Sequence, residues 1–185
     1  MLSDFPAGWT SAPHSEQKTE EADAKLNECL HIPGTKLIPN AANADSEDFT
    51  SPDQAEVQNS VSVTQSAANV TSAHDLLASP GTPPCLTTYF NTVLKTASLR
   101  DAKFGTASVN PLSSEKLGDR TVALRATIPV TSKGIEVSVY ADVWVAQKGR
   151  VAVILEGIDE FSPFPTDTAT QLIQKVLAKI PPGTG

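Results

Sequence analysis

Residues 135–146, Ile-Glu-Val-Ser-Val-Tyr-Ala-Asp-Val-Trp-Val-Ala, decide the fold class of this 185-residue chain. Apolar side chains alternate with other types along the stretch, and such alternation predicts a half-buried β-strand. The odd positions, from Ile135 to Val145, are uniformly apolar and are expected to face the helices of the protein. The opposite face of the strand is expected to carry the even positions Glu136, Ser138, Tyr140, Asp142 and Trp144.

Neighbouring segments extend this strand into a meander. Three of them, residues 104–111, 120–130 and 151–158, also have the composition of strands. The short Gly-containing segments 132–134 and 147–149 have the size of hairpin turns. Because hairpins join antiparallel strands, the C-terminal half of the chain predicts a mostly antiparallel sheet.

The N-terminal half adds helices and one further alternating strand. Residues 57–64 predict a strand, and residues 45–51 an extended lead into it. Helices are expected at 19–30, 67–78, 82–97 and 169–180, with Thr82 as an N-cap and Pro83 at the first helical position. The fold class is therefore α+β, a mostly antiparallel twisted sheet with helices packed mainly on one face. We expect one domain over 19–180, an irregular lead-in at 1–18 and a tail at 181–185.

Charge and hydropathy disfavour several classes of partner. The formal net charge is −7, the isoelectric point is near 4.9 and the basic residues do not cluster. Nucleic acid and anionic membrane surfaces are therefore disfavoured. We expect no membrane-spanning segment, because no apolar run approaches the ~20 residues that a bilayer crossing needs, and no signal segment within this chain.

Cys29 and Cys85 are the two cysteines of the chain. Each lies beside a Leu on a predicted helix, and a single pairing is possible. A structural disulfide is favoured, and two buried free thiols are the alternative. The wide spacing excludes a redox CxxC motif, and two cysteines without paired histidines make a poor zinc site.

Catalytic and cofactor motifs do not stand out in the sequence. No GxSxG or SxxK motif occurs in a supporting context, and no Gly-rich phosphate loop is present. His14, His31 and His74 lack metal-ligand spacing. We therefore expect a non-enzymatic domain with no metal and no cofactor.

One set of side chains is a candidate ligand-binding site on the polar face of the sheet. Its members are Arg125, Tyr140, Asp142, Trp144 and Glu156. Aromatic rings would supply contact area and the guanidinium would orient an anionic group of a small polar or amphiphilic ligand. Two alternatives are a solvent-facing surface and a surface covered by the lead-in through Phe5 and Trp9. A structural or protein-interaction module of the cell envelope, using this face or the loop 161–165, is the second functional hypothesis.

Short motifs spread over the chain carry a resemblance to a known group. They are FPAGW at 5–9, LNECL at 26–30, SEDF at 46–49, PPCL at 83–86 and LGDRTVA at 117–123. The chain resembles actinobacterial secreted proteins and lipoproteins, which are similar to the extracellular sensor-type domain of the PknH receptor kinase. This resemblance implies an extracytoplasmic protein, secreted or lipid-anchored, with an intact disulfide and a ligand-binding or sensory role.

Overall fold

The structure is a computed structural model that describes residues 1–14, 20–32, 37–97 and 102–181. These residues contain four α-helices, a short 3-10 helix at Leu2–Asp4 and nine strands that form one sheet. The helices are α1 (Glu20–Cys29), α2 (Ala67–Leu77), α3 (Thr82–Thr96) and α4 (Thr166–Lys179). The strands are β1 (Thr10–Ala12), β2 (Asn40–Asp45), β3 (Asp48–Thr50), β4 (Glu56–Thr64), β5 (Ala102–Phe104), β6 (Ser108–Pro111), β7 (Arg120–Ser132), β8 (Ile135–Lys148) and β9 (Val151–Asp159). Thr19, the expected start of the first helix, and positions 182–185 of the expected tail lie outside the described residues.

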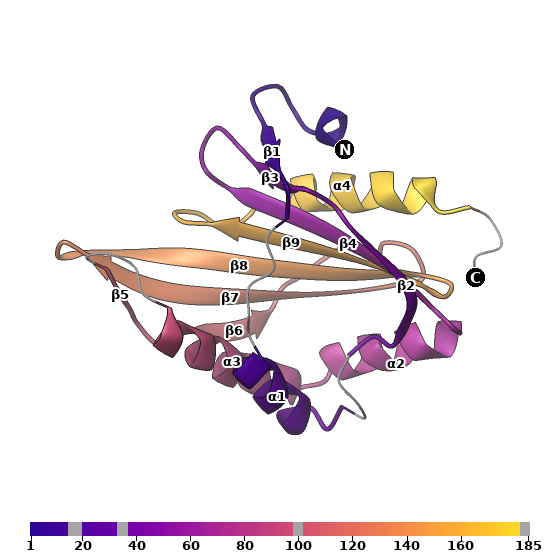
Figure 1. Ribbon diagram of the computed structural model, residues 1–185, viewed down its shortest axis with the longest axis horizontal. Coiled ribbons are helices and arrows are strands. Elements are labelled where there is room, and N and C mark those ends of the chain that lie inside the picture. The colour runs from indigo at the N-terminus through magenta and orange to yellow at the C-terminus, as the bar shows by residue number, and fades with distance from the viewer. Residues whose placement is uncertain (15–19, 33–36, 98–101, 182–185) are drawn as a thin grey trace.

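The sheet has the strand order β1-β3-β4-β9-β8-β7-β5, with β2 also on β4 and β6 also on β7. All pairings between these named strands are antiparallel. The long β7–β8 hairpin and β9 form its centre (Figure 1), as the alternation over 135–146 predicts. The predicted α+β fold class is confirmed.

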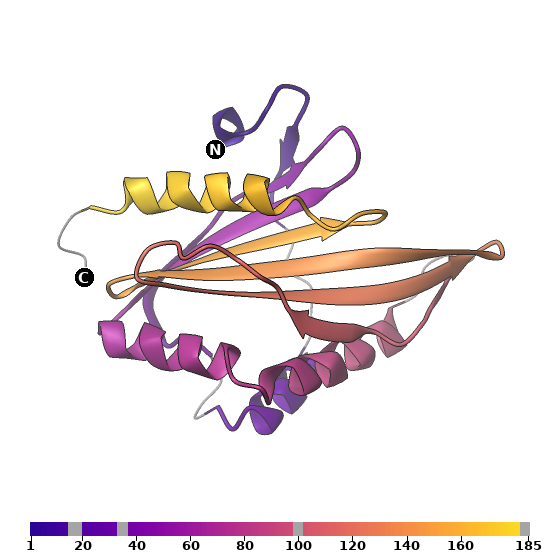
Figure 2. The same ribbon diagram turned by 180° about the vertical axis from the view of Figure 1, so that it is seen from behind.

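Helices cover both faces of the sheet unequally. Figures 1 and 2 show α1, α2 and α3 on one side and α4 alone on the other. The side under α4 holds the larger core, which includes Val57, Trp144, Leu155, Phe164 and Ile173. Lys148 Nζ fixes the end of α4 to the sheet by donating to the carbonyl oxygens of Leu177 at 2.8 Å and Ile180 at 3.1 Å, as a cation at a helix C-terminus does.

Two segments differ from the sequence-based prediction. The predicted strand at 104–111 is divided between two strands, β5 and β6, which pair with β7 in registers that differ by one residue. The Gly105 amide donates to the Pro129 carbonyl at 2.7 Å, but Pro129 has no N–H to donate in return, so the β5 ladder ends there. A Cβ at position 105 would lie 3.0 Å from the Pro129 side chain, which is a tight contact, so the close approach favours glycine. The lead-in expected to be irregular contains β1, which pairs with β3.

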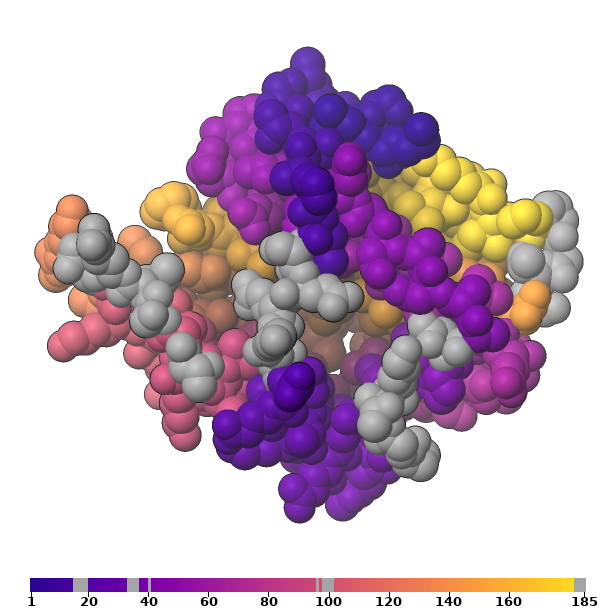
Figure 3. Space-filling model, in the orientation of Figure 1, coloured from indigo at the N-terminus to yellow at the C-terminus, as the bar shows by residue number. Residues whose placement is uncertain are grey.

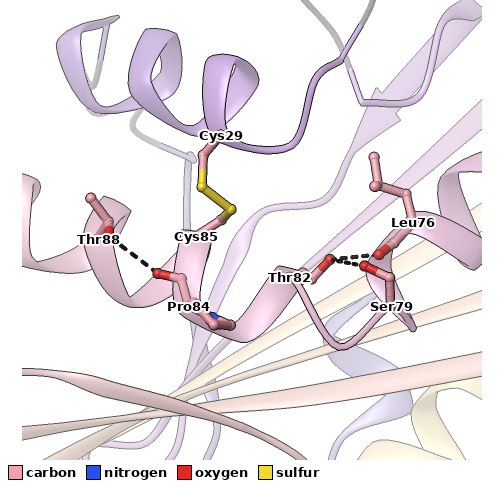
Figure 4. Close-up of a disulfide and its surroundings, with 7 residues drawn as sticks. All are labelled: Cys29, Leu76, Ser79, Thr82, Pro84, Cys85 and Thr88. Carbon is pink, nitrogen blue, oxygen red and sulfur yellow. Dashed lines mark hydrogen bonds between the residues drawn. A yellow bond between two sulfur atoms is a disulfide. The ribbon is translucent and has the colours of Figure 1, made fainter.

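A disulfide joins the end of α1 to the first turn of α3 (Figure 4). Cys29 and Cys85 are bonded, with their Cα atoms 5.7 Å apart, so the alternative of two free thiols is wrong. Thr82 does not cap α3 as predicted, because the helix begins at Thr82 itself and Gly81 is the N-cap residue. The Thr82 hydroxyl instead donates to the Leu76 carbonyl at 2.5 Å and so ties α3 to the end of α2.

Within the described residues, no helix combines the length and hydropathy that crossing a bilayer would take.

Candidate functional site

Arg125 and Asp142 of the predicted site meet as a bidentate ion pair. They lie opposite each other on β7 and β8, and Arg125 donates from Nε at 2.6 Å and from Nη2 at 2.7 Å to the two carboxylate oxygens. The Asp142 side chain is fully buried, whereas that of Arg125 is 21% exposed. The hydrogen bonds to Asp142 raise the pKa of Arg125. The pair therefore places a fixed, charge-compensated group at this point of the sheet.

Tyr140 lies beside this ion pair. The guanidinium carbon of Arg125 lies 5.9 Å from the centroid of the Tyr140 ring, which is within cation–π range. Both side chains are half-buried. Arg125, Tyr140 and Asp142 thus form the part of the predicted site that the structure brings together.

Trp144 lies on the same face but is not available to a ligand. It is 1% exposed, because α4 passes over it and the Phe164 ring packs against it with centroids 6.0 Å apart. Phe5 and Trp9 also pack onto this core, which agrees with the alternative of a face covered by the lead-in. The prediction that Trp144 belongs to an open ligand-binding face is therefore wrong. At this position the face of β8 that carries the even-numbered residues is covered by α4 and Phe164.

Glu156 lies on the opposite face of the sheet from the other four residues. The β8–β9 register sets it across from Val143, whereas Gly157 lies across from Asp142. Residues directly opposite in an antiparallel pair share a face. The prediction that Glu156 joins Arg125 and Tyr140 in one site is therefore wrong in its geometry.

The face that carries Glu156 contains a hollow of about 360 Å³ between α1, α3 and the sheet. Figure 3 shows the surface hollowed between α1 and the orange strands of the sheet. Its lining is mainly aliphatic and aromatic, and includes Leu26, Leu37, Ile38, Leu77, Leu86, Phe90, Val122, Leu124, Val143, Val145, Ile154 and Ile158. A concave apolar cavity of this volume is typical of sites for small molecules.

Each element contributes a distinct part of the hollow. Strands β7, β8 and β9 form its floor, where the small residues Ala126 and Ala141 lie opposite each other. Helix α3 supplies one wall through Leu86 and Phe90, and α1 supplies another through Leu26. Because the disulfide ties α1 to α3, it fixes the position of one wall against the other.

Glu156 is the feature of the lining that an apolar core would not contain. Glu156 is exposed to solvent and also lines the hollow. Its neighbours across the sheet are Val143 of β8 and Gln58 of β4. The surrounding protein atoms shield the Glu156 carboxylate from water, and this desolvation raises its pKa above the usual value. The charge of His14 lowers this pKa, and the charge of Asp45 raises it further. The protonated, neutral form of this carboxyl group is therefore favoured more than in water.

His14 and Asp48 form a second charged group close enough to act on Glu156. His14 Nδ1 lies 2.6 Å from Asp48 Oδ1, and this hydrogen bond raises the pKa of His14. The pair links the end of the lead-in to β3 at the surface. Among the described residues, no three His, Cys, Asp or Glu side chains cluster as a metal site would require.

The loop 161–165, predicted as a possible partner surface, divides between surface and core. Phe164 is buried at 2% exposure, whereas Phe161 is 70% exposed. Asp159 holds the loop by accepting hydrogen bonds from the amides of Phe161 at 2.9 Å and Ser162 at 3.1 Å. One exposed ring on a fixed loop is a small contact surface.

Comparison with known proteins gives a similarity of fold to solved structures. No family model matches the chain. No curated protein matches it in sequence. Among solved structures, it is similar to the extracellular domain of PknH from Mycobacterium tuberculosis, with a TM-score of 0.43 and 10% sequence identity over 91% of this chain and 99% of that one.

Sequence reasoning missed the hollow, although two signals for it are present. Alternation alone predicts a sealed core on the odd face of β8, but the facing pair Ala126 and Ala141 leaves space above the sheet. A lone carboxylate in the apolar run Val-Ile-Leu-Glu-Gly-Ile at 153–158 is the second signal. A buried apolar strand seldom carries an unpaired Glu unless the position borders a cavity or solvent.

Proposed function

We propose that this domain binds a small apolar or amphiphilic molecule in the hollow between α1, α3 and the sheet, in a non-catalytic, sensor-type role. The observation that carries the proposal is the hollow itself, a cavity of about 360 Å³ with a mainly apolar lining. An apolar ligand in the hollow would bury its own surface and that of the lining. Each Å² of apolar surface removed from water contributes roughly 25 cal/mol of favourable binding free energy.

The rigidity of the site supports the same function. The floor consists of long antiparallel strands, and the wall from α1 is held by the Cys29–Cys85 bond. A cavity that is formed before the ligand arrives loses less conformational entropy on binding. The disulfide also supports a location outside the cytoplasm, since such bonds persist in oxidising compartments.

A protein-interaction role has weaker support. It would rest on the Phe161 loop, where a single exposed ring offers far less area than a stable protein interface buries. The hollow offers an enclosed apolar surface formed by several elements, so it is the better-supported site.

Filling the hollow from within tests the proposal. Val143→Trp places a large ring on the floor, beside Glu156, and is expected to abolish the fluorescence increase of the neutral apolar dye Nile red on mixing with the protein. The matched control is Ser138→Trp, which adds the same ring to the other face of β8 and should leave the dye signal unchanged. Dye binding that survives Val143→Trp in a folded protein, or no dye binding by the unmodified chain, would overturn the proposal.

A further inference from the structure

Glu156 gives the hollow a chemical preference that its apolar lining alone would not have. The carboxylate lies at the floor position between Val143 and Gln58, with Ile154 and Ile158 two residues away on the same face of β9. Among the described residues it has neither a hydrogen bond nor an ion pair, and the Gln58 amide donates to the Asn59 carbonyl. A carboxylate in such surroundings gains most from a partner that is both cationic and a hydrogen-bond donor.

The other charges near the hollow have mostly the same sign. No Lys, Arg or His is among the described residues that line the hollow. The charge of Asp142, whose side chain lies on the other face of the sheet, is neutralised by Arg125. His14 is the one cationic group that acts on Glu156 among the described side chains, and it is hydrogen-bonded to Asp48. The field at the hollow therefore favours a positive head group over a negative one.

We propose that the ligand of the hollow is a cationic amphiphile, an alkyl chain ending in a protonated amine whose ammonium group binds the Glu156 carboxylate. This inference rests on the proposed function, because it specifies the molecule that the hollow takes. The apolar lining accepts the chain, and the hollow has a volume of about 360 Å³. That volume corresponds to about a dozen water-sized groups, enough for a chain of medium length. A carboxylate-headed amphiphile would meet the Glu156 carboxylate with like charge.

The experiment compares three probes that share a decyl chain and differ in head group: decylammonium, decanol and decanoate. Each is titrated near neutral pH as a competitor of Nile red, the two ionic probes below their critical micelle concentrations and decanol below its solubility limit. Decylammonium is expected to bind about tenfold tighter than decanol, because its ammonium group adds a charge-assisted hydrogen bond to Glu156 in a partly shielded site. Decanoate is expected to bind most weakly, because its charge has the same sign as that of Glu156.

Two variants assign the preference to its residue. Glu156→Gln keeps the shape and removes the charge, so it should bring decylammonium and decanol to within about twofold of each other. Glu136→Gln removes the same charge from an exposed position on the other face of β8 and should retain the preference. Thermal unfolding of both variants checks that they are folded.

The outcomes separate the two proposals. If decanol binds but decylammonium binds no tighter, or if the preference persists in Glu156→Gln, the head-group inference is wrong and the apolar site stands. If decanoate binds tightest, the inferred charge of the ligand is wrong. If none of the three probes binds, both proposals fail together.

Discussion

The ion pair of Arg125 and Asp142 shows how one polar pair can serve a core rather than a site. Asp142 is fully buried, and two short hydrogen bonds from one guanidinium compensate its charge. Leaving such a carboxylate without its partner is costly, whereas replacing both members by apolar groups is often nearly neutral. At the scale of the residue, we therefore expect the hairpin to depend on both members of the pair being present together.

Removing Arg125 alone should therefore be worse than removing both members. Arg125→Met is expected to lower the free energy of unfolding by about 2–3 kcal/mol, somewhat less than for a fully buried pair because the guanidinium is partly exposed. The double variant Arg125→Met/Asp142→Leu should recover most of that loss. Urea unfolding of the complete cycle measures the coupling energy, and simple additivity of the two changes would contradict this account.

Glu156 should make the stability of the fold depend on pH. A carboxyl group with a raised pKa holds its proton more tightly in the folded chain, so its contribution is present below the ordinary value of 4.5 and is lost as pH rises through the folded pKa. Glu156→Gln stays neutral, so its stability relative to the unmodified protein should increase as pH rises above 4.5. Urea midpoints at acidic and neutral pH check this, with Glu136→Gln as the control that should show no such trend.

Two elements, α1 and α4, determine which face of the sheet is open. Helix α4 lies close over β8 and β9 because Gly157 provides no side chain and the Phe164 ring occupies that space. Helix α1 buries only Ala22, and the disulfide supplies much of what holds it in place against α3. One helix therefore seals its side, while the other bounds a hollow.

Adding a methyl group beneath α4 should weaken this seal. A Cβ at Gly157 would lie 2.9 Å from Phe164 Cγ, so Gly157→Ala is expected to destabilise the protein by about 1–3 kcal/mol through overpacking. Gly81→Ala is the matched control, since a Cβ there meets nothing closer than 3.8 Å. This control should change stability by no more than about 0.5 kcal/mol. Thermal and urea unfolding measure the stability change of each variant. Equal changes in the two variants would show that the close contact between position 157 and Phe164 does not cause the destabilisation.

Loss of the disulfide should affect both stability and binding. The bond closes a loop with a sequence separation of 56 residues. Cys29→Ser/Cys85→Ser is therefore expected to cost about 4 kcal/mol in the chain-entropy description. Because α1 forms a wall of the hollow, Nile red affinity should also fall severalfold in folded protein. Unchanged affinity in the serine variant would show that α1 keeps its position without the bond.

At the scale of the whole molecule, the sheet separates the main core from the candidate site. Trp144 and Phe164 pack on one face, whereas the hollow lies on the other, bounded by α1 and α3. A substitution in the hollow can therefore alter binding without direct loss of contacts in the larger core.

Ligand binding should appear as a gain in stability of the whole fold. At a free concentration one hundred times the dissociation constant, decylammonium is expected to add about 2.7 kcal/mol to the free energy of unfolding. Val143→Trp should lose this gain, while Ser138→Trp should keep it. A thermal shift of equal size in Val143→Trp would show that the amine binds elsewhere.

Much of this architecture follows from local patterns, and the candidate site does not. Alternation over 135–146 predicts β8, and the turn that sets Ser132 across from Ile135 brings Arg125 opposite Asp142. The next turn sets Lys148 across from Val151, so even positions of β8 face odd positions of β9, and Glu156 falls on the other side. The face that α4 covers depends on long-range contacts such as Trp144 with Phe164, which alternation cannot specify.

The pairing of β4 with β9 has a consequence for how quickly the hollow can appear during folding. The Asn59 side chain donates to the Ile154 carbonyl across 95 positions of sequence, whereas β7, β8 and β9 are joined by tight turns. Local hairpins form before distant segments meet, because closing a long loop costs more chain entropy. We therefore expect the meander to assemble early and the docking of β4 to limit the folding rate. Recovery of dye binding during refolding would then follow the slowest phase, so the cavity would report on completion of the native topology.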